Sequence, residues 1–217
     1  MLEAAFWGLI GGLALVLGAI LGLWLPASQR TIGMVMAFGA GVLISALAFE
    51  LTDEAFRRGG SDTVALGLAG GALTFFVGDW IVDQRGGAHR KRSDGRQSGG
   101  AASGIVVGAM LDGIPESVAI GVTVLERGKV APAVVAAVFL SNIPESLSAA
   151  TGLRKAGHST RWIIGLWTGV ALISAAAAAL GYVALGDVTP NIIGLIQAFA
   201  AGAILTMLAD TMMPESF

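Results

Sequence analysis

Two copies of the tetrapeptide Ile-Pro-Glu-Ser hold the acidic residues whose chemistry this sequence has to explain. They occupy residues 114–117 and 143–146 and place Glu116 and Glu145 within apolar segments. A carboxylate deep in an apolar helix costs at least about 2.5 to 3.5 kcal/mol on insertion scales, so it marks a functional site unless a structural partner neutralises it. The interiors of the apolar segments contain no lysine or arginine. We therefore expect a bound cation or protons to compensate the two carboxylates.

Further oxygen atoms flank each glutamate at helical spacing. Asp112 precedes Glu116 by four residues, and Ser141 and Asn142 precede Glu145 by four and three. Residues three or four apart lie on one face of a helix, so each segment presents its polar groups together. This pattern predicts a metal site formed by Asp112, Glu116, Ser141, Asn142 and Glu145.

A proline stands directly before each glutamate, at Pro115 and Pro144. Proline cannot donate a backbone hydrogen bond, so the carbonyls of Leu111 and Leu140 are free to accept from water or to bind a metal. The alternative is structural. In that case the prolines only bend the helices, and each glutamate stays protonated and hydrogen-bonded to the serine that follows it.

The composition is that of a membrane protein. Hydrophobic residues make up 55% and charged residues 13% of the 217 residues, and the mean hydropathy is +0.78. This is more apolar surface than one soluble core can bury. A net charge of −2 gives no electrostatic footprint for nucleic acid. The absence of cysteine excludes disulfides and thiolate metal ligands.

Seven apolar segments are long enough to cross about 30 Å of hydrocarbon as helices. They are residues 4–26, 31–51, 62–83, 102–125, 131–152, 161–186 and 191–213. Pairs of glycines four residues apart, which let helices approach closely in lipid, occur at Gly18 and Gly22, Gly67 and Gly71, Gly104 and Gly108, and Gly165 and Gly169. We predict an all-α integral membrane protein, a polytopic helix bundle that forms a single transmembrane domain over residues 1–217.

Residues 84–101 interrupt the apolar pattern with glycine, serine and arginine, and predict a flexible loop. The connections on the side of this loop carry nine lysines and arginines, and those on the opposite side carry four. The positive-inside rule therefore places the 84–101 loop in the cytoplasm and the N-terminus outside. We therefore expect a multi-pass protein of the cell membrane.

The segments are related by two internal repeats. Residues 37–56 and 198–217 align without gaps, with Gly41 matching Gly202. Residues 112–121 and 141–150 share the Ile-Pro-Glu-Ser motif. Because the members of each pair cross the membrane in opposite directions, the pattern is typical of the inverted repeats of secondary transporters. A pseudo-two-fold axis would bring the two Pro-Glu steps face to face.

Further acids stand near both ends of the repeated segments, where carboxylates attract cations. We predict that they flank a cation pathway, although a solvated helix end explains any one of them equally well. They are Glu50, Asp53 and Glu54 on the outer side, and Asp210 and Glu215 on the inner side.

These motifs resemble the ZIP (Zrt/Irt-like) family of metal transporters, in particular its bacterial branch with a Pro-Glu-Gly step in helices four and five. The resemblance covers essentially the whole chain, including the paired IPES steps and the AFxAG motifs in spans two and seven. It implies eight helices in a 3+2+3 arrangement, where this chain has seven spans. It also implies dimerisation in the membrane and import of zinc or related divalent ions.

Carried over by position, Glu116 and Glu145 correspond to the shared metal-binding glutamates of the family. Asp112 stands where family members usually have a histidine, and Ser141 with Asn142 stand where a histidine or glutamine precedes an acidic or amide group. Span six contributes no acid, so the number of metal positions stays open. The two histidines, His89 and His158, fall in predicted cytoplasmic loops, where solvated side chains are expected.

We therefore expect a transporter that moves divalent metal ions toward the cytoplasm and that is not an enzyme. Oxygen ligands suit Mn²⁺, Fe²⁺ or Mg²⁺ better than Zn²⁺ or Cu²⁺. A carrier must also release its cargo, so zinc, iron, manganese and cadmium all stay open as substrates, and no cofactor is expected. The alternatives are a transporter for a small organic cation and a non-transporting membrane protein that binds metal. The expected partners are metal ions, the lipid bilayer and a second copy of the chain, and not nucleic acid.

Overall fold

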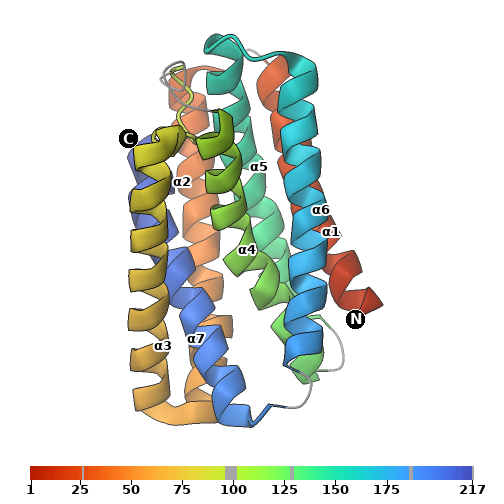
Figure 1. Ribbon diagram of the computed structural model, residues 1–217, viewed down its shortest axis with the longest axis vertical. Coiled ribbons are helices and arrows are strands. Elements are labelled where there is room, and N and C mark those ends of the chain that lie inside the picture. The colour runs from red at the N-terminus through yellow and green to blue at the C-terminus, as the bar shows by residue number, and fades with distance from the viewer. Residues whose placement is uncertain (26, 96–101, 128–129, 186–187, 217) are drawn as a thin grey trace.

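The computed structural model of the chain describes residues 1–25, 27–95, 102–127, 130–185 and 188–216. Every regular element in these ranges is helical (Figure 1). The α-helices are α1 (Leu2–Trp24), α2 (Gln29–Ala46), α3 (Asp53–Val82), α4 (Ala102–Arg127), α5 (Pro132–Lys155), α6 (Thr160–Ala184), α7 (Pro190–Met207) and the short α8 (Met213–Ser216). Three π-helical segments extend them, η1 (Leu47–Thr52), η2 (Asp83–Gly87) and η4 (Leu208–Met212).

The predicted transmembrane architecture is confirmed. In the described ranges, six helical stretches are long and apolar enough to cross a membrane, and the second of them runs from Gln29 to Gly87. This stretch contains two of the seven predicted segments, because Gly60 breaks it with φ 71° and ψ −173°. A positive φ of this kind favours glycine, which has no Cβ. The chain reverses there from α2 into the upright part of α3 (Figure 1).

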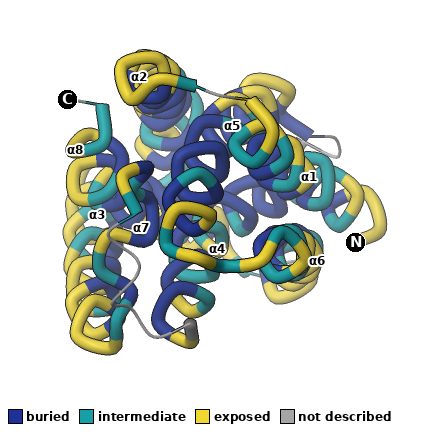
Figure 2. The backbone as a smooth tube through the Cα atoms, turned by 90° about the horizontal axis from the view of Figure 1, so that it is seen from above, coloured by how far each residue is buried: buried dark blue, intermediate teal, exposed yellow. Residues whose placement is uncertain are grey.

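Successive long helices run in opposite directions, with the N-terminus toward the lower end of Figure 1 and the C-terminus toward the upper end. Seen from above, the buried residues face the middle of the bundle and the exposed residues face outward (Figure 2). α5 is buried along most of its length. Large apolar side chains such as Phe49, Leu66 and Leu180 are exposed on the outside, as expected for helices that face lipid.

Three of the four predicted glycine pairs lie at close contacts. A Cβ at Gly18 or Gly22 would overlap a backbone carbonyl of α5, and one at Gly67 or Gly71 would overlap α7. Gly104 and Gly108 lie against residues of the connection that follows α3. Gly165 and Gly169 differ, because within the described residues no atom lies within 4 Å of a Cβ built on either.

The two members of the longer repeat, α2 with η1 and α7 with η4, run in opposite directions (Figure 1). Their π-helical segments begin at the matching residues Leu47 and Leu208. The surroundings of the matching glycines differ, however. A Cβ at Gly202 would overlap the carbonyl oxygen of Leu68 in α3, whereas no described atom lies within 4 Å of a Cβ at Gly41. α7 therefore packs against α3 at Gly202, whereas the matching surface of α2, at Gly41, has no described neighbour.

This difference gives a prediction with an internal control. Gly202→Ala is expected to destabilise the bundle by about 1 to 3 kcal/mol, because the new methyl group forces α3 and α7 apart. Gly41→Ala, at the matching position, is expected to change stability by less than about 0.5 kcal/mol. Thermal unfolding of both variants in detergent micelles checks the pair. Equal melting temperatures would contradict the packing described here.

Candidate functional site

Three of the predicted ligands come together inside the bundle. Asp112 and Glu116 of α4 and Glu145 of α5 are 1%, 1% and 3% exposed. One lysine side chain lies 3.4 Å from Asp112 and 3.1 Å from Glu145, and Glu116 follows Asp112 by about one turn of α4, so the two antiparallel Pro-Glu steps meet in one cluster. Neither glutamate faces the outside of the bundle.

The cluster contains two basic side chains that sequence reasoning did not place there. Arg90 and Lys91, from the connection between α3 and α4, are 5% and 4% exposed. The Arg90 guanidinium donates to Asp112 through Nε at 2.8 Å and through Nη2 at 2.9 Å, and Nη2 also donates to Asp79 of α3. Lys91 Nζ lies 3.1 Å from Glu145 Oε1 and 3.4 Å from Asp112 Oδ2.

The expectation that only a bound cation or protons compensate the two glutamates is therefore wrong for Glu145, which pairs with Lys91 in this conformation. The helix interiors do lack basic residues, but the connection after α3 turns back into the bundle. η2 covers residues 83–87, and a turn follows in which Arg90 N donates to Gly87 O at 3.1 Å and Arg92 N donates to His89 O at 2.9 Å. His89 has a φ of 65°, a left-handed conformation that histidine adopts more readily than most residues. Of the predicted loop, residues 96–101 lie outside the described ranges.

Arg90 is held as a cation by its surroundings. Burial alone would lower the pKa of Arg90, but the Coulombic attraction and hydrogen bonds of Asp112, followed by those of Asp79, raise this pKa above the ordinary guanidinium value. A guanidinium that forms two parallel bonds to one carboxylate is also fixed in orientation. Arg90 therefore acts as a permanent structural charge.

The two polar residues predicted as ligands on α5 form bonds elsewhere. Ser141 Oγ donates to Val138 O in its own helix at 3.0 Å, and Asn142 Nδ2 donates to Gly11 O of α1 at 3.0 Å. Both side chains are buried. Their donor groups serve helix packing, whereas a metal ion would bind their oxygen atoms, so the role of these two residues as ligands stays a prediction.

The serines that follow the glutamates also bond within their own helices. Ser117 Oγ donates to Gly113 O at 2.7 Å, and Ser146 Oγ donates to Asn142 O at 2.8 Å. In this conformation each serine hydroxyl therefore donates to its own helix and not to the glutamate before it. Glu116 Oε1 is buried and has no hydrogen-bond partner among the described residues. A buried polar atom of this kind calls for a ligand or a proton to explain it.

The acids predicted to flank a pathway fall at the two ends of the bundle. Asp53 pairs with Arg57 at 2.8 Å and Glu54 with Arg58 at 2.9 Å, both one helical turn apart. Glu50 lies in η1, at the same end. At the opposite end, a polar cavity of about 240 Å³ lies beside the buried cluster and is lined in part by Asp79, Asp83, Arg90, Lys91 and Asp210.

Glu215, the remaining flanking acid, holds the connection in place. Its Oε1 accepts a hydrogen bond from Ser93 N at 2.8 Å and lies 2.8 Å from Ser148 Oγ. The same serine hydroxyl lies 2.6 Å from Lys91 O, and Lys155 Nζ donates to Ser93 O at 2.8 Å. α5 and α8 therefore anchor the backbone that carries Lys91.

Within the described ranges, no group of three or more histidine, aspartate or glutamate residues has a geometry that would hold a metal ion. Lys91 Nζ lies between Asp112 and Glu145, and a metal ion would need these carboxylates to approach one another. No known protein-family model matches the chain, and no curated protein matches it. The function is therefore inferred from the site itself.

Proposed function

We propose that this protein is a membrane transporter that moves divalent metal cations toward the cytoplasm through the cluster of Asp112, Glu116 and Glu145. The observation that supports this proposal best is the convergence of these carboxylates inside an apolar helix bundle, with Glu116 Oε1 left without a partner. Ionisable residues are expensive within a membrane and mark ion pathways in transporters. The inverted repeat of α2 and α7 supports the same class of function.

The balance of buried charge favours a divalent cargo. Six ionisable side chains are buried in the described part of the chain, namely Asp79, Asp112, Glu116, Glu145, Arg90 and Lys91. If all six are ionised, the four acids exceed the two bases by two negative charges. One divalent cation neutralises this excess, and two protons do the same in its absence. Metal binding would then displace protons.

The ligand chemistry sets the class of metal. Carboxylate oxygens without imidazole or thiolate favour Mn²⁺, Fe²⁺ and Mg²⁺ over Zn²⁺ in kind, although a carrier with modest zinc affinity still transports zinc. The resemblance to the ZIP family supports import across the cell membrane by a homodimer whose N-terminus lies outside.

Uptake into proteoliposomes tests the proposed function. Purified protein is reconstituted, and the initial uptake of Mn²⁺, Fe²⁺, Zn²⁺, Cd²⁺ and Mg²⁺ is measured beside protein-free vesicles. The expected result is saturable uptake of at least one ion, reduced by competing ions of the same class. Thermal stabilisation by a metal without uptake would indicate a non-transporting metal-binding protein. If no ion is taken up and no ion stabilises the protein, the proposal is contradicted.

A further inference from the structure

The segment His89–Ser93 reaches into the bundle although it belongs to a connection between helices. Arg90, Lys91 and Ser93 are buried, whereas His89 is exposed. Its part after Arg90, residues 91–93, can leave the bundle without unfolding a helix. The departure of this part would expose Asp112 and Glu145, which it now covers.

The two basic side chains of this segment are bound in different ways. Arg90 forms two hydrogen bonds with Asp112 and a further one with Asp79. Lys91 Nζ lies within ion-pair distance of Glu145 and Asp112, but has no aligned hydrogen-bond partner among the described residues. A lysine ammonium is a compact charge on a flexible stem, so Lys91 is the side chain that another cation can replace most easily.

We propose that residues 91–93 form a plug tethered at Arg90, in which the Lys91 ammonium holds the position of the transported cation between Asp112 and Glu145. This proposal rests on the proposed function. Because Lys91 and the metal compete for the same carboxylates, metal binding and plug withdrawal are linked. The apparent metal affinity is then the intrinsic affinity multiplied by the fraction of molecules in which the plug does not cover the site. The chain thereby limits its own transport at low metal concentration.

The anchors of the plug lie outside the carboxylate cluster. Ser148 Oγ lies 2.6 Å from Lys91 O, and Glu215 Oε1 accepts from Ser93 N. Ser148→Ala removes one anchor and leaves the six buried ionisable side chains in place. It therefore loosens the plug without creating an unpaired buried charge, which is the risk with Lys91→Met.

Cysteine labelling measures the position of the plug independently of transport. The chain contains no cysteine, so Ser93→Cys introduces a single thiol at a residue that is 3% exposed. In detergent micelles, we expect slow labelling by a polar maleimide without metal, and labelling at least about tenfold faster with a saturating concentration of the ion that the uptake assay shows to be carried. Lys91→Met in this background should label fast without metal, whereas Lys91→Arg should label slowly.

Uptake supplies the second arm. Relative to the parent, Lys91→Met and Ser148→Ala are expected to lower the half-saturating metal concentration, by about tenfold for Lys91→Met and less for Ser148→Ala. Arg85→Met, which removes an exposed positive charge from the middle of η2, is the matched control and should leave this concentration unchanged.

The outcomes separate the two proposals. Uptake by the parent, combined with unchanged labelling and unchanged half-saturation in both Lys91→Met and Ser148→Ala, would overturn the plug and leave the proposed function standing. Uptake of no ion by any variant would overturn the proposed function and, with it, the competition between Lys91 and metal. In that case, faster labelling of the Lys91→Met variant would show only that Lys91 holds the segment in place.

Discussion

Glu116→Gln is expected to reduce metal uptake by at least about a hundredfold, because losing a direct ligand should exceed the 10- to 100-fold effect typical of residues that support a ligand. Glu116 is 1% exposed, and Oε1 has no partner among the described residues. Glutamine has nearly the same shape but lacks the charge and replaces one carboxylate oxygen with an amide nitrogen. Since no described ion pair is broken, the melting temperature should stay the same or rise. Initial uptake rates, normalised to folded protein, measure the effect.

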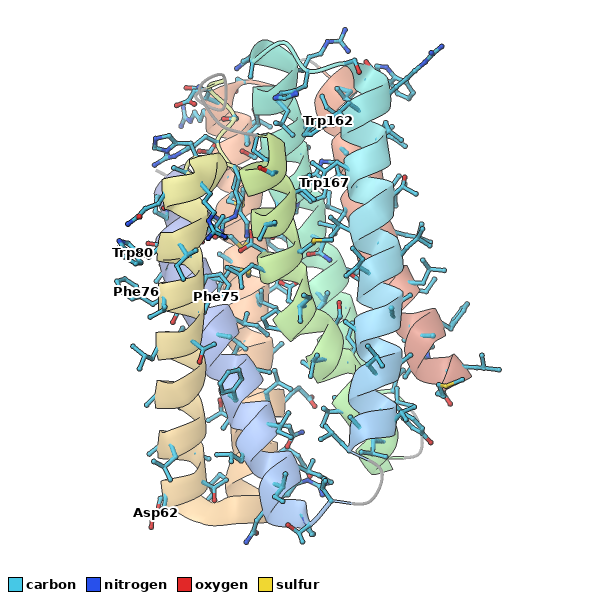
Figure 3. The ribbon with its side chains drawn as sticks, in the orientation of Figure 1. Asp62, Phe75, Phe76, Trp80, Trp162 and Trp167 are labelled. Atoms are coloured by element: carbon cyan, nitrogen blue, oxygen red, sulfur yellow. The ribbon has the colours of Figure 1, made fainter. Side chains whose placement is uncertain are left out.

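Asp62→Asn is the control for this substitution. Asp62 lies at the lower end of α3, away from the bundle interior (Figure 3), and is exposed. Its replacement removes the same charge and should change uptake by less than about twofold, because an exposed charge more than a Debye length away is screened. Uptake by Glu116→Gln at the parent rate would remove Glu116 from the site.

Glu145→Gln should differ from Glu116→Gln in stability as well as in uptake. Glu145 is the nearer ion-pair partner of Lys91, at 3.1 Å. Loss of its charge leaves the ammonium with Asp112, which already binds Arg90. We therefore expect both lower uptake and a lower melting temperature, whereas Glu116→Gln lowers uptake alone. Equal melting temperatures for the two variants would contradict the assigned role of Lys91.

The fold was predictable because its signal is local. Twenty consecutive apolar residues favour a membrane span whatever the rest of the chain does, and most described residues of each predicted segment lie in helices. The inward direction of Glu116 and Glu145 followed from helical spacing and from the price of exposing a carboxylate to lipid. The matching start of the π-helical segments at Leu47 and Leu208 shows that the repeat extends to details of the backbone.

The basic half of the cluster was not predictable in the same way. The composition of residues 89–92 predicts a solvent-exposed loop. The positive-inside rule uses only the number of basic residues in this loop and not their positions. Its position depends on contacts with residues far away in the sequence, such as Ser148 and Glu215. One signal did point to it, because Asp79, four residues before the end of the predicted span 62–83, had no basic partner within any span.

Side-chain direction set a second limit. Ser141 and Asn142 have the right spacing for ligands, but the spacing did not predict that their donor groups bond to Val138 O and Gly11 O. The tryptophans show the same limit (Figure 3). Trp80 is exposed on α3, whereas Trp167 is buried among the helices. Sequence spacing identifies the face of a helix, but the neighbouring helix decides what that face contacts.

Arg90→Met is expected to destabilise the protein by about 3 to 5 kcal/mol, because removing one partner of a buried ion pair leaves an uncompensated charge. Here two carboxylates, Asp79 and Asp112, lose their shared guanidinium. Arg92→Met, two residues further along, should cost about 0 to 1 kcal/mol, since a partly exposed pair contributes little. The Arg92 side chain is 31% exposed and lies 3.3 Å from Glu215. Chemical unfolding in detergent micelles compares the two variants.

The triple variant Arg90→Met with Asp79→Asn and Asp112→Asn separates charge from shape. If Arg90 acts by neutralising the two aspartates, removal of all three charges should restore most of the stability lost in Arg90→Met, because coupled residues are not additive. Lys91 and Glu145 stay paired in this variant, so their contact is preserved. An equally large loss in the triple variant would show that Arg90 stabilises the bundle by packing. The same variant should transport poorly even when stable, because it lacks the Asp112 carboxylate that the proposed site requires.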